Sequence, residues 1–171
     1  SFTGFMGPAD EARVGREQHP EIVRAFGGAY ADRRVQDYVT RVGQSIARVT
    51  ETPELRFTFT VLDSPVVNAF ALPGGYVYVT RGLMAIASDE AELAGVIAHE
   101  IGHVTARHAA RRYSQQVVAG VGTAVVGVIT GSDDIAETFS FGASAVLQSY
   151  SRDQEFEADT LGVRYLGRAG Y

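Results

Sequence analysis

Residues 96–105 read VIAHEIGHVT, a stretch that combines the apolar pattern of a buried helix with three ionisable side chains. At about 100° per residue, one helical face is apolar. That face carries Leu93, Val96, Ile97, Ile101 and Val104. Glu100 projects into the middle of it. Because burying an unpaired charge is costly, the stretch predicts either a protonated Glu100 or a partner that stabilises its carboxylate.

His99 and His103 are four residues apart, so their rings stand on one helical face with about 5–6 Å between Cβ atoms. One metal ion can bind both rings. Glu100 lies about 100° further round the helix, too far to join the two imidazoles but able to reach a water on the metal. A divalent cation would therefore explain why a charge at Glu100 is tolerated.

The HExxH spacing alone leaves two readings open, because a pattern with three fixed positions also arises by chance on the polar edge of a helix. Gly95 and Gly102 favour the metal site. Each costs about 1 kcal/mol relative to Ala in a helix interior, and a plain core helix gains nothing from that cost. We expect these glycines to let another backbone approach the helix.

Zinc at a catalytic site takes three protein ligands and leaves a fourth position for water. A histidine in the extended HExxHxxGxxH pattern is excluded as the third ligand, because Ala106 and Ala109 stand at the required positions. We interpret His19 and His108 as solvated surface histidines. The third ligand is then expected to be a carboxylate on a later helix.

Residues 151–162, SRDQEFEADTLG, supply Glu155 and Asp159 one helical turn apart. In one interpretation Glu155 binds the metal and Asp159 accepts the free ring N–H of a ligand histidine. In the other, the segment is an acidic face in contact with solvent, to which Glu157 belongs in either case. The residues alone do not separate the two.

Outward from these motifs, hydrophobic periodicity predicts a mixture of helices and strands. Helices are expected over residues 31–50, 89–113 and 143–166, with an earlier helical piece broken near Pro20. Strands are expected over residues 55–62, 66–71 and 76–80, the last two joined by a Pro-Gly-Gly turn.

Length and composition indicate one domain over residues 1–171, since 46% hydrophobic residues can build a core. All 15 basic residues are Arg, the net charge is −5 and there is no basic patch, so nucleic acid is excluded as a partner. Without cysteine, disulfides and thiolate chemistry are excluded. The first residues lack the pattern of a signal peptide.

The most apolar window covers residues 117–131 and is shorter than the roughly 20 residues that a membrane-spanning helix needs. A packed Gly-rich segment and contact with a membrane surface both remain open for it.

Three motifs in order resemble the gluzincin metallopeptidase family that includes the CaaX prenyl protease and HtpX. They are His99-Glu100-xx-His103, Glu155-xxx-Asp159, and the strand-and-turn segment NAFALPGGYVYVTRG at residues 68–82. The last is most similar to the soluble, BepA-like branch of the bacterial periplasm. The resemblance spans residues 2–171, and three motifs in order are far more specific than one.

The resemblance implies an α+β, zincin-like metallopeptidase domain, mostly helical, with a small antiparallel sheet packed on the HExxH helix. It implies one Zn²⁺ per chain held by His99, His103 and Glu155, with Glu100 as general base and Asp159 supporting a ligand histidine. The activity implied is hydrolysis of unfolded or misassembled polypeptides in the periplasm or cell envelope. A zinc-binding chaperone or adaptor that holds such chains without cutting them is the alternative.

The family also implies that the strand before the turn borders the cleft and pairs with substrate, which points to Asn68, Ala69 and Phe70 as substrate-binding residues. A local turn at Asn68 and a core position for Phe70 are the structural alternatives. The BepA-like branch continues into a segment whose histidine supports the transition state. The chain is therefore expected to be truncated before that extension, or to use Tyr150, Arg152 or Tyr165 instead.

Overall fold

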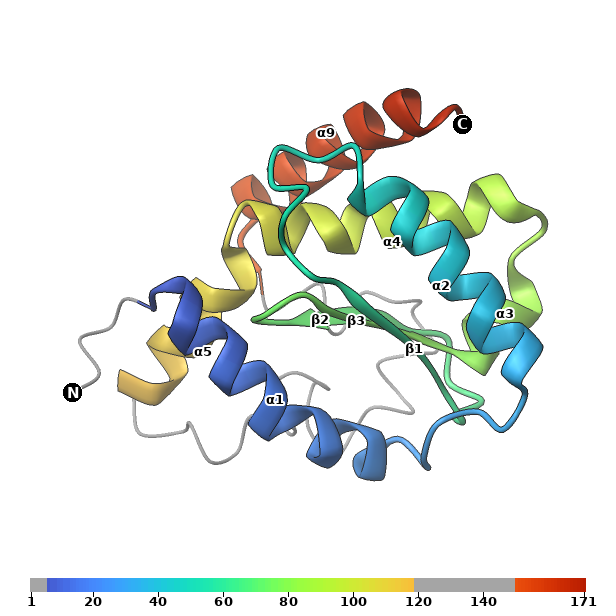
Figure 1. Cartoon of the computed structure of the whole chain (residues 1–171), viewed down its shortest axis with the longest axis horizontal. Coiled ribbons are helices and arrows are strands. Elements are labelled where there is room, and N and C mark those ends of the chain that lie inside the picture. Colours follow the sequence, from blue (N-terminus) through green and yellow to red (C-terminus); the bar gives the residue numbers. More distant parts are fainter. Residues whose placement is uncertain (1–5, 119–149) are drawn as a thin grey trace.

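The computed structural model describes residues 6–118 and 150–171. The described elements follow one another as α1 (Pro8–Ala25), α2 (Arg33–Ala47), β1 (Thr58–Leu62), β2 (Ala69–Leu72), β3 (Tyr76–Thr80), α3 (Arg81–Ile86), α4 (Glu90–Thr105), α5 (His108–Val118) and α9 (Arg152–Ala169). Helices predominate around one small sheet (Figure 1). The α+β class expected from the sequence is confirmed.

The sheet is mixed, with strand order β1-β3-β2. β2 and β3 form the expected antiparallel hairpin, and Gly74 and Gly75 in its turn have φ values of 89° and 83°. The prediction of a wholly antiparallel sheet was wrong, because β1 pairs with β3 in parallel. After β1 the chain crosses to the far edge before the hairpin returns β3 to the centre, and hydrophobic alternation carries no information on that crossing.

Helices cover both faces of the sheet, as side-chain alternation requires. Phe59, Val61, Ala69, Ala71, Val77 and Val79 belong to one buried cluster, together with apolar residues of α2, α4 and α9. Leu62, Phe70, Leu72 and Tyr78 belong to a second cluster with Ile22 and Phe26, so they face α1. Figure 1 shows α2, α4 and α9 on one side of the sheet and α1 on the other.

α1 runs through Pro20 without a break, which corrects the expected interruption there. Proline removes one backbone hydrogen bond, but Val14 before it and Ile22 after it are both buried. Packing of the two halves in the interior therefore holds them in one helix.

The region expected as one helix over residues 89–113 forms two helices, α4 and α5, because the chain turns at Ala106 and Arg107. Arg107 has a φ of 63°, which is unusual for a residue other than glycine. Its guanidinium donates to the Met6 carbonyl and to the Glu11 carboxylate, the latter at 3.3 Å. Contacts with Met6 and with Glu11 of α1, both distant in sequence, thus hold the turn.

α9 begins at Arg152, with Ser151 as N-cap and Gln154 completing a capping box. This corrects the expected start near residue 143; residues 143–149 lie outside the described part. Residues 119–131 of the apolar window also lie outside it. Among the described helices, none combines the length and apolarity that crossing a membrane demands.

Candidate metal centre

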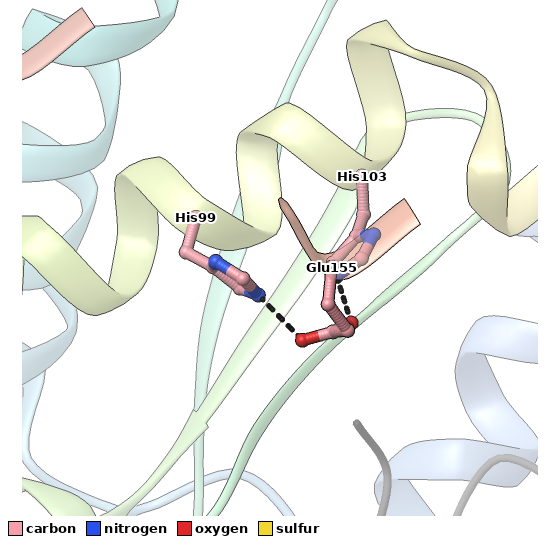
Figure 2. A group of neighbouring side chains, drawn as sticks. All are labelled: His99, His103 and Glu155. Atoms are coloured by element: carbon pink, nitrogen blue, oxygen red, sulfur yellow. Dashed lines mark ion pairs between the residues drawn. The ribbon is translucent and has the colours of Figure 1, made fainter. Parts of the chain in front are cut away.

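α4 provides the two histidines of the centre. Its apolar stripe is buried at Leu93, Ile97 and Ile101, which fixes the rotation of the helix about its axis. His99 and His103 then project from an adjacent face, with ring centroids 4.8 Å apart and planes at 86°. Figure 2 shows both rings on the same side of α4.

α9 packs along α4 (Figure 1), and glycines on both helices allow a close approach. A Cβ built at Gly102 would stand 2.9 Å from the Ala158 carbonyl oxygen, and one at Gly162 would stand 3.2 Å from the His99 nitrogen. The close approach expected at Gly102 is confirmed. Gly95 does not share it, since its nearest neighbour is a Leu166 methyl at 4.0 Å.

This packing brings Glu155 of α9 to the two histidines. Its carboxylate oxygens lie 3.3 Å from His99 Nε2 and 2.8 Å from His103 Nε2. In Figure 2 the carboxylate faces both rings. The ligand atoms all lie within 4.8 Å of one another, as a group that could hold a metal ion must.

The donor set fits zinc, which binds imidazole nitrogen and carboxylate oxygen at about 2.0–2.2 Å. His99 Nε2, His103 Nε2 and Glu155 Oε1 are buried, yet none has a hydrogen-bond partner with acceptable geometry among the described residues. Buried polar atoms are rarely left so. Three of them converging on one point are what a shared metal ion would satisfy.

Asp159 lies one helical turn beyond Glu155, and its Oδ1 is 2.7 Å from His99 Nδ1. The Asp159 side chain is exposed and the His99 ring is largely buried. With Nδ1 in contact with Asp159, the other ring nitrogen of His99, Nε2, faces the Glu155 carboxylate. It matches the arrangement in which a carboxylate fixes the tautomer of a metal-binding histidine.

Burial raises the pKa of Glu100 to about 8, and the negative charge of Glu155 adds to the effect. His99 and Arg112 oppose the shift. Only 2% of Glu100 is exposed. A carboxyl whose pKa lies near neutrality can both accept and return a proton.

The three candidate ligands differ in charge. Burial lowers the pKa of His103 to about 4, so this ring is neutral. Burial would raise the pKa of Glu155, but the two histidines outweigh it and lower the value to about 2. Burial would likewise lower the pKa of His99, but carboxylates around it raise the value to about 9.

His108 and His19 are not the solvated histidines that the sequence suggested. His108 is 1% exposed and its Nδ1 lies 2.9 Å from His103 Nδ1. His19 is partly buried, with Nδ1 2.6 Å from the Tyr78 hydroxyl. Neither belongs to the group of candidate metal ligands.

Glu157 is half-exposed, and its Oε1 lies 2.5 Å from His108 Nε2. It is therefore not only a solvated residue. Sequence reasoning missed this contact because His108 would face elsewhere if the helix continued past residue 105. No glycine or proline marks the turn at Arg107.

The three residues considered for transition-state support differ in placement. The Tyr150 ring stacks on His103, with centroids 3.9 Å apart and planes at 12°. The Tyr165 hydroxyl instead contacts Thr105 and Glu51, at 2.8 and 2.5 Å, and Arg152 is exposed at the start of α9. Of the three, only Tyr150 contacts a candidate ligand in the described structure.

The proposed substrate-binding residues lie at or beside β2. Asn68 is fully buried, and neither of its side-chain amide atoms has a hydrogen-bond partner among the described residues. Phe70 is also fully buried and stacks on Tyr78, with centroids 4.9 Å apart. Its side chain is therefore core, as the structural alternative held, and its main chain pairs with Tyr78 of β3.

Comparison with known proteins agrees with this geometry. The chain is 33% identical over 171 residues to a putative beta-barrel assembly-enhancing protease of Vibrio cholerae, covering 95% of this chain and 35% of the relative. It is 31% identical to the mitochondrial metalloendopeptidase OMA1 of Schizosaccharomyces pombe, covering 93% and 48%. A beta-barrel assembly-enhancing protease of Escherichia coli is 29% identical, covering 82% and 31%.

The chain thus spans between about a third and a half of the length of these relatives. Residues 33–171 also match the model of peptidase family M48. That region contains the two histidines of α4 and the acidic pair of α9. The chain belongs to peptidase family M48.

Proposed function

We propose that this domain is a zinc endopeptidase that cleaves unfolded or misassembled polypeptides, with one zinc ion held by His99, His103 and Glu155. The observation that carries the proposal is the convergence of three buried ligand atoms that have no hydrogen-bond partner in the described structure. Membership of peptidase family M48 supports the metallopeptidase class.

Glu100 is the general base of this proposal. It is buried next to the ligand group. Without metal, burial raises its pKa to about 8; the positive charge of a bound zinc ion would favour the carboxylate form that a general base requires. Zinc, when bound, supplies Lewis-acid polarisation of the scissile carbonyl and acidifies water. Glu100 then takes a proton from the attacking water and passes it to the leaving amine.

The two acidic residues, Glu155 and Asp159, have different roles: Glu155 binds the metal and Asp159 orients a ligand histidine. Glu155 faces both ring nitrogens and completes the donor set. Asp159 accepts a hydrogen bond from His99 Nδ1, so that Nε2 presents its lone pair to the metal. Asp159 holds a ligand in place without binding the metal itself.

Substrate binding is proposed at the outer edge of β2. The Thr80 N–H donates to the Asn68 carbonyl at 3.1 Å, and the Asn68 N–H donates to Thr80 Oγ1 at 3.0 Å. Hydrogen-bonded and non-bonded pairs alternate along an antiparallel ladder. The N–H and C=O of Ala69 therefore point away from β3, where an extended peptide can pair with them.

The buried amide of Asn68 supports this assignment: neither amide atom has a hydrogen-bond partner among residues 6–118 and 150–171, and such burial is costly unless something else binds the side chain. Main-chain pairing discriminates weakly between sequences, which suits unfolded chains as substrates. A location in the periplasm or cell envelope rests on the similarity to the BepA-like branch and on relatives named for beta-barrel assembly.

Cleavage of casein by the purified chain tests the proposal. We expect one zinc per chain, fragments of casein, loss of cleavage when a chelator removes the metal, and recovery when zinc is restored. Tight zinc binding with casein held intact would contradict the proposal and identify a chaperone or adaptor. Absence of zinc binding would contradict both.

A further inference from the structure

We propose that His108 and Glu157 are positioning residues for the metal centre, acting on its ligand His103 through a chain of two hydrogen bonds. This inference rests on the proposed zinc site and goes beyond it, because neither residue belongs to the ligand group. His103 Nδ1 lies 2.9 Å from His108 Nδ1, and His108 Nε2 lies 2.5 Å from Glu157 Oε1.

The direction of both hydrogen bonds follows from the chemistry of imidazole. If His103 Nε2 presents its lone pair to a metal, its proton resides on Nδ1, so Nδ1 donates. His108 Nδ1 must then accept, which leaves the proton of a neutral His108 ring on Nε2. That N–H donates to the Glu157 carboxylate. Every ring nitrogen of the two histidines then has one defined role.

The two candidate ligand histidines are thus held in parallel ways. The Nδ1 of His99 is bound directly by the carboxylate of Asp159. The Nδ1 of His103 is fully buried and reaches the carboxylate of Glu157 only through His108. Partners of this kind fix ring orientation and tautomer and strengthen the ligand.

The local backbone is built for this contact. A helix continued past Thr105 would carry His108 to another face, and the turn at Arg107 redirects it toward His103. Arg107 holds a positive φ of 63° to do so, stabilised by Glu11 of α1. The Tyr150 ring stacks on one face of the His103 ring. The His103 ring is therefore held by this stacking and by the hydrogen bond at its Nδ1.

The test compares zinc affinity in His108→Leu and His108→Asn, two variants of similar size. The Asn side-chain oxygen stands near the position of Nδ1 and can accept from His103; Leu cannot. Competition with a chromophoric chelator should show zinc binding weakened by about 10–100-fold in His108→Leu, and mostly restored in His108→Asn. Cobalt substituted for zinc should show a changed visible spectrum in the Leu variant.

Glu157→Gln tests the outer link at a half-exposed position that the fold tolerates. It should weaken zinc binding, whereas Asp153→Asn, the same change at an exposed site on α9, should not. Melting temperatures of the metal-free proteins separate positioning from stability.

If both His108→Leu and Glu157→Gln bind zinc with wild-type affinity, the proposed hydrogen-bond chain has no positioning role. This holds even if metal-free His108→Leu melts at a lower temperature than wild type. If His108→Leu does not fold, Glu157→Gln against Asp153→Asn decides. Failure of the wild-type chain to bind zinc would instead overturn the proposed function.

Discussion

Gly102 on α4 and Ala158 on α9 meet backbone to backbone: a Cβ at Gly102 would stand 2.9 Å from the Ala158 carbonyl oxygen. Ala158 lies between Glu155 and Asp159 on α9, and Gly102 lies next to His103 on α4. The contact therefore fixes the distance between the two helices, and with it the distance from the carboxylates of α9 to the histidines of α4.

Replacing Gly102 with Ala should destabilise the protein despite the higher helix propensity of Ala. The gain of about 1 kcal/mol is opposed by a contact that requires one backbone to move, which costs about 1–3 kcal/mol in packed interiors. Urea unfolding in the presence of a chelator measures the difference. Zinc affinity should fall as well, because α9 carries Glu155.

Gly95→Ala is the matched control on the same helix. Within the described part of the chain its Cβ would meet only a Leu166 methyl at 4.0 Å, so the substitution should raise the free energy of unfolding by about 0.4–1 kcal/mol. If Gly102→Ala proved as stable as Gly95→Ala, the backbone contact would not be a constraint on the site.

Glu155→Ala should lose stoichiometric zinc, because removing one of three ligands destroys tight binding. Asp153→Ala is the appropriate control, since Asp153 is exposed on the same helix. Glu157 cannot serve, because it pairs with His108. Metal analysis after dialysis measures the outcome, and equal zinc in the two variants would refute the ligand assignment.

Zinc binding at pH 7 should release about one proton from His99. In the metal-free fold its pKa is raised from 6.5 to about 9, while only a neutral ring binds metal. Observed affinity should therefore rise at least about tenfold per pH unit below pH 8, where Glu100 also titrates, and level off above about pH 9. Calorimetry in buffers of different ionisation enthalpy counts the protons, and no release at pH 7 would contradict the assignment.

The raised pKa values of His99 and Glu100 make the metal-free fold less stable as pH rises from 6.5 to about 9. His99 stabilises the fold fully below pH 6.5 and loses this contribution as pH passes about 9. The pKa of Glu100 is raised from 4.5 to about 8 in the fold, so its contribution to stability falls between pH 4.5 and about 8. Chemical unfolding between pH 6.5 and 9, with chelator present, should show the decline. Below pH 6.5 the loss at Glu100 is opposed by His103, whose lowered pKa makes the fold gain stability as pH rises from about 4.

Ala69→Pro should raise KM or abolish cleavage if an extended substrate pairs with β2, because proline removes the N–H that points away from β3. Zinc content and circular dichroism should stay unchanged. Wild-type cleavage by a folded, zinc-loaded variant would refute strand addition. Should the variant fail to fold, Asn68→Ala is expected to raise KM instead, and an unchanged KM there would be the refuting result.

Local pattern accounts for much of the fold. Alternation in residues 57–61 and the Pro-Gly-Gly turn predicted strands that are present, and the apolar stripe of α4 predicted how His99 and His103 face. These features depend on neighbours along the chain. The pairing of β1 with β3 depends instead on how a connection crosses the sheet.

The parts that escaped prediction depend on distant contacts. The turn at Arg107 has no local marker, and Met6 and Glu11, far away in sequence, stabilise it. His108 could be placed beside His103 only once that turn was known. The continuity of α1 through Pro20 likewise depends on burial of both halves in the interior.

The most direct test of the zinc endopeptidase account is the comparison of Glu100→Gln with wild type. The substitution is nearly isosteric, and Glu92→Gln, at an exposed position on the same helix, is its control. Glu100→Gln should fold, keep one zinc per chain and lose at least about a hundredfold in turnover of casein, while Glu92→Gln keeps full activity. Unchanged turnover in a zinc-loaded Glu100→Gln protein would contradict the account.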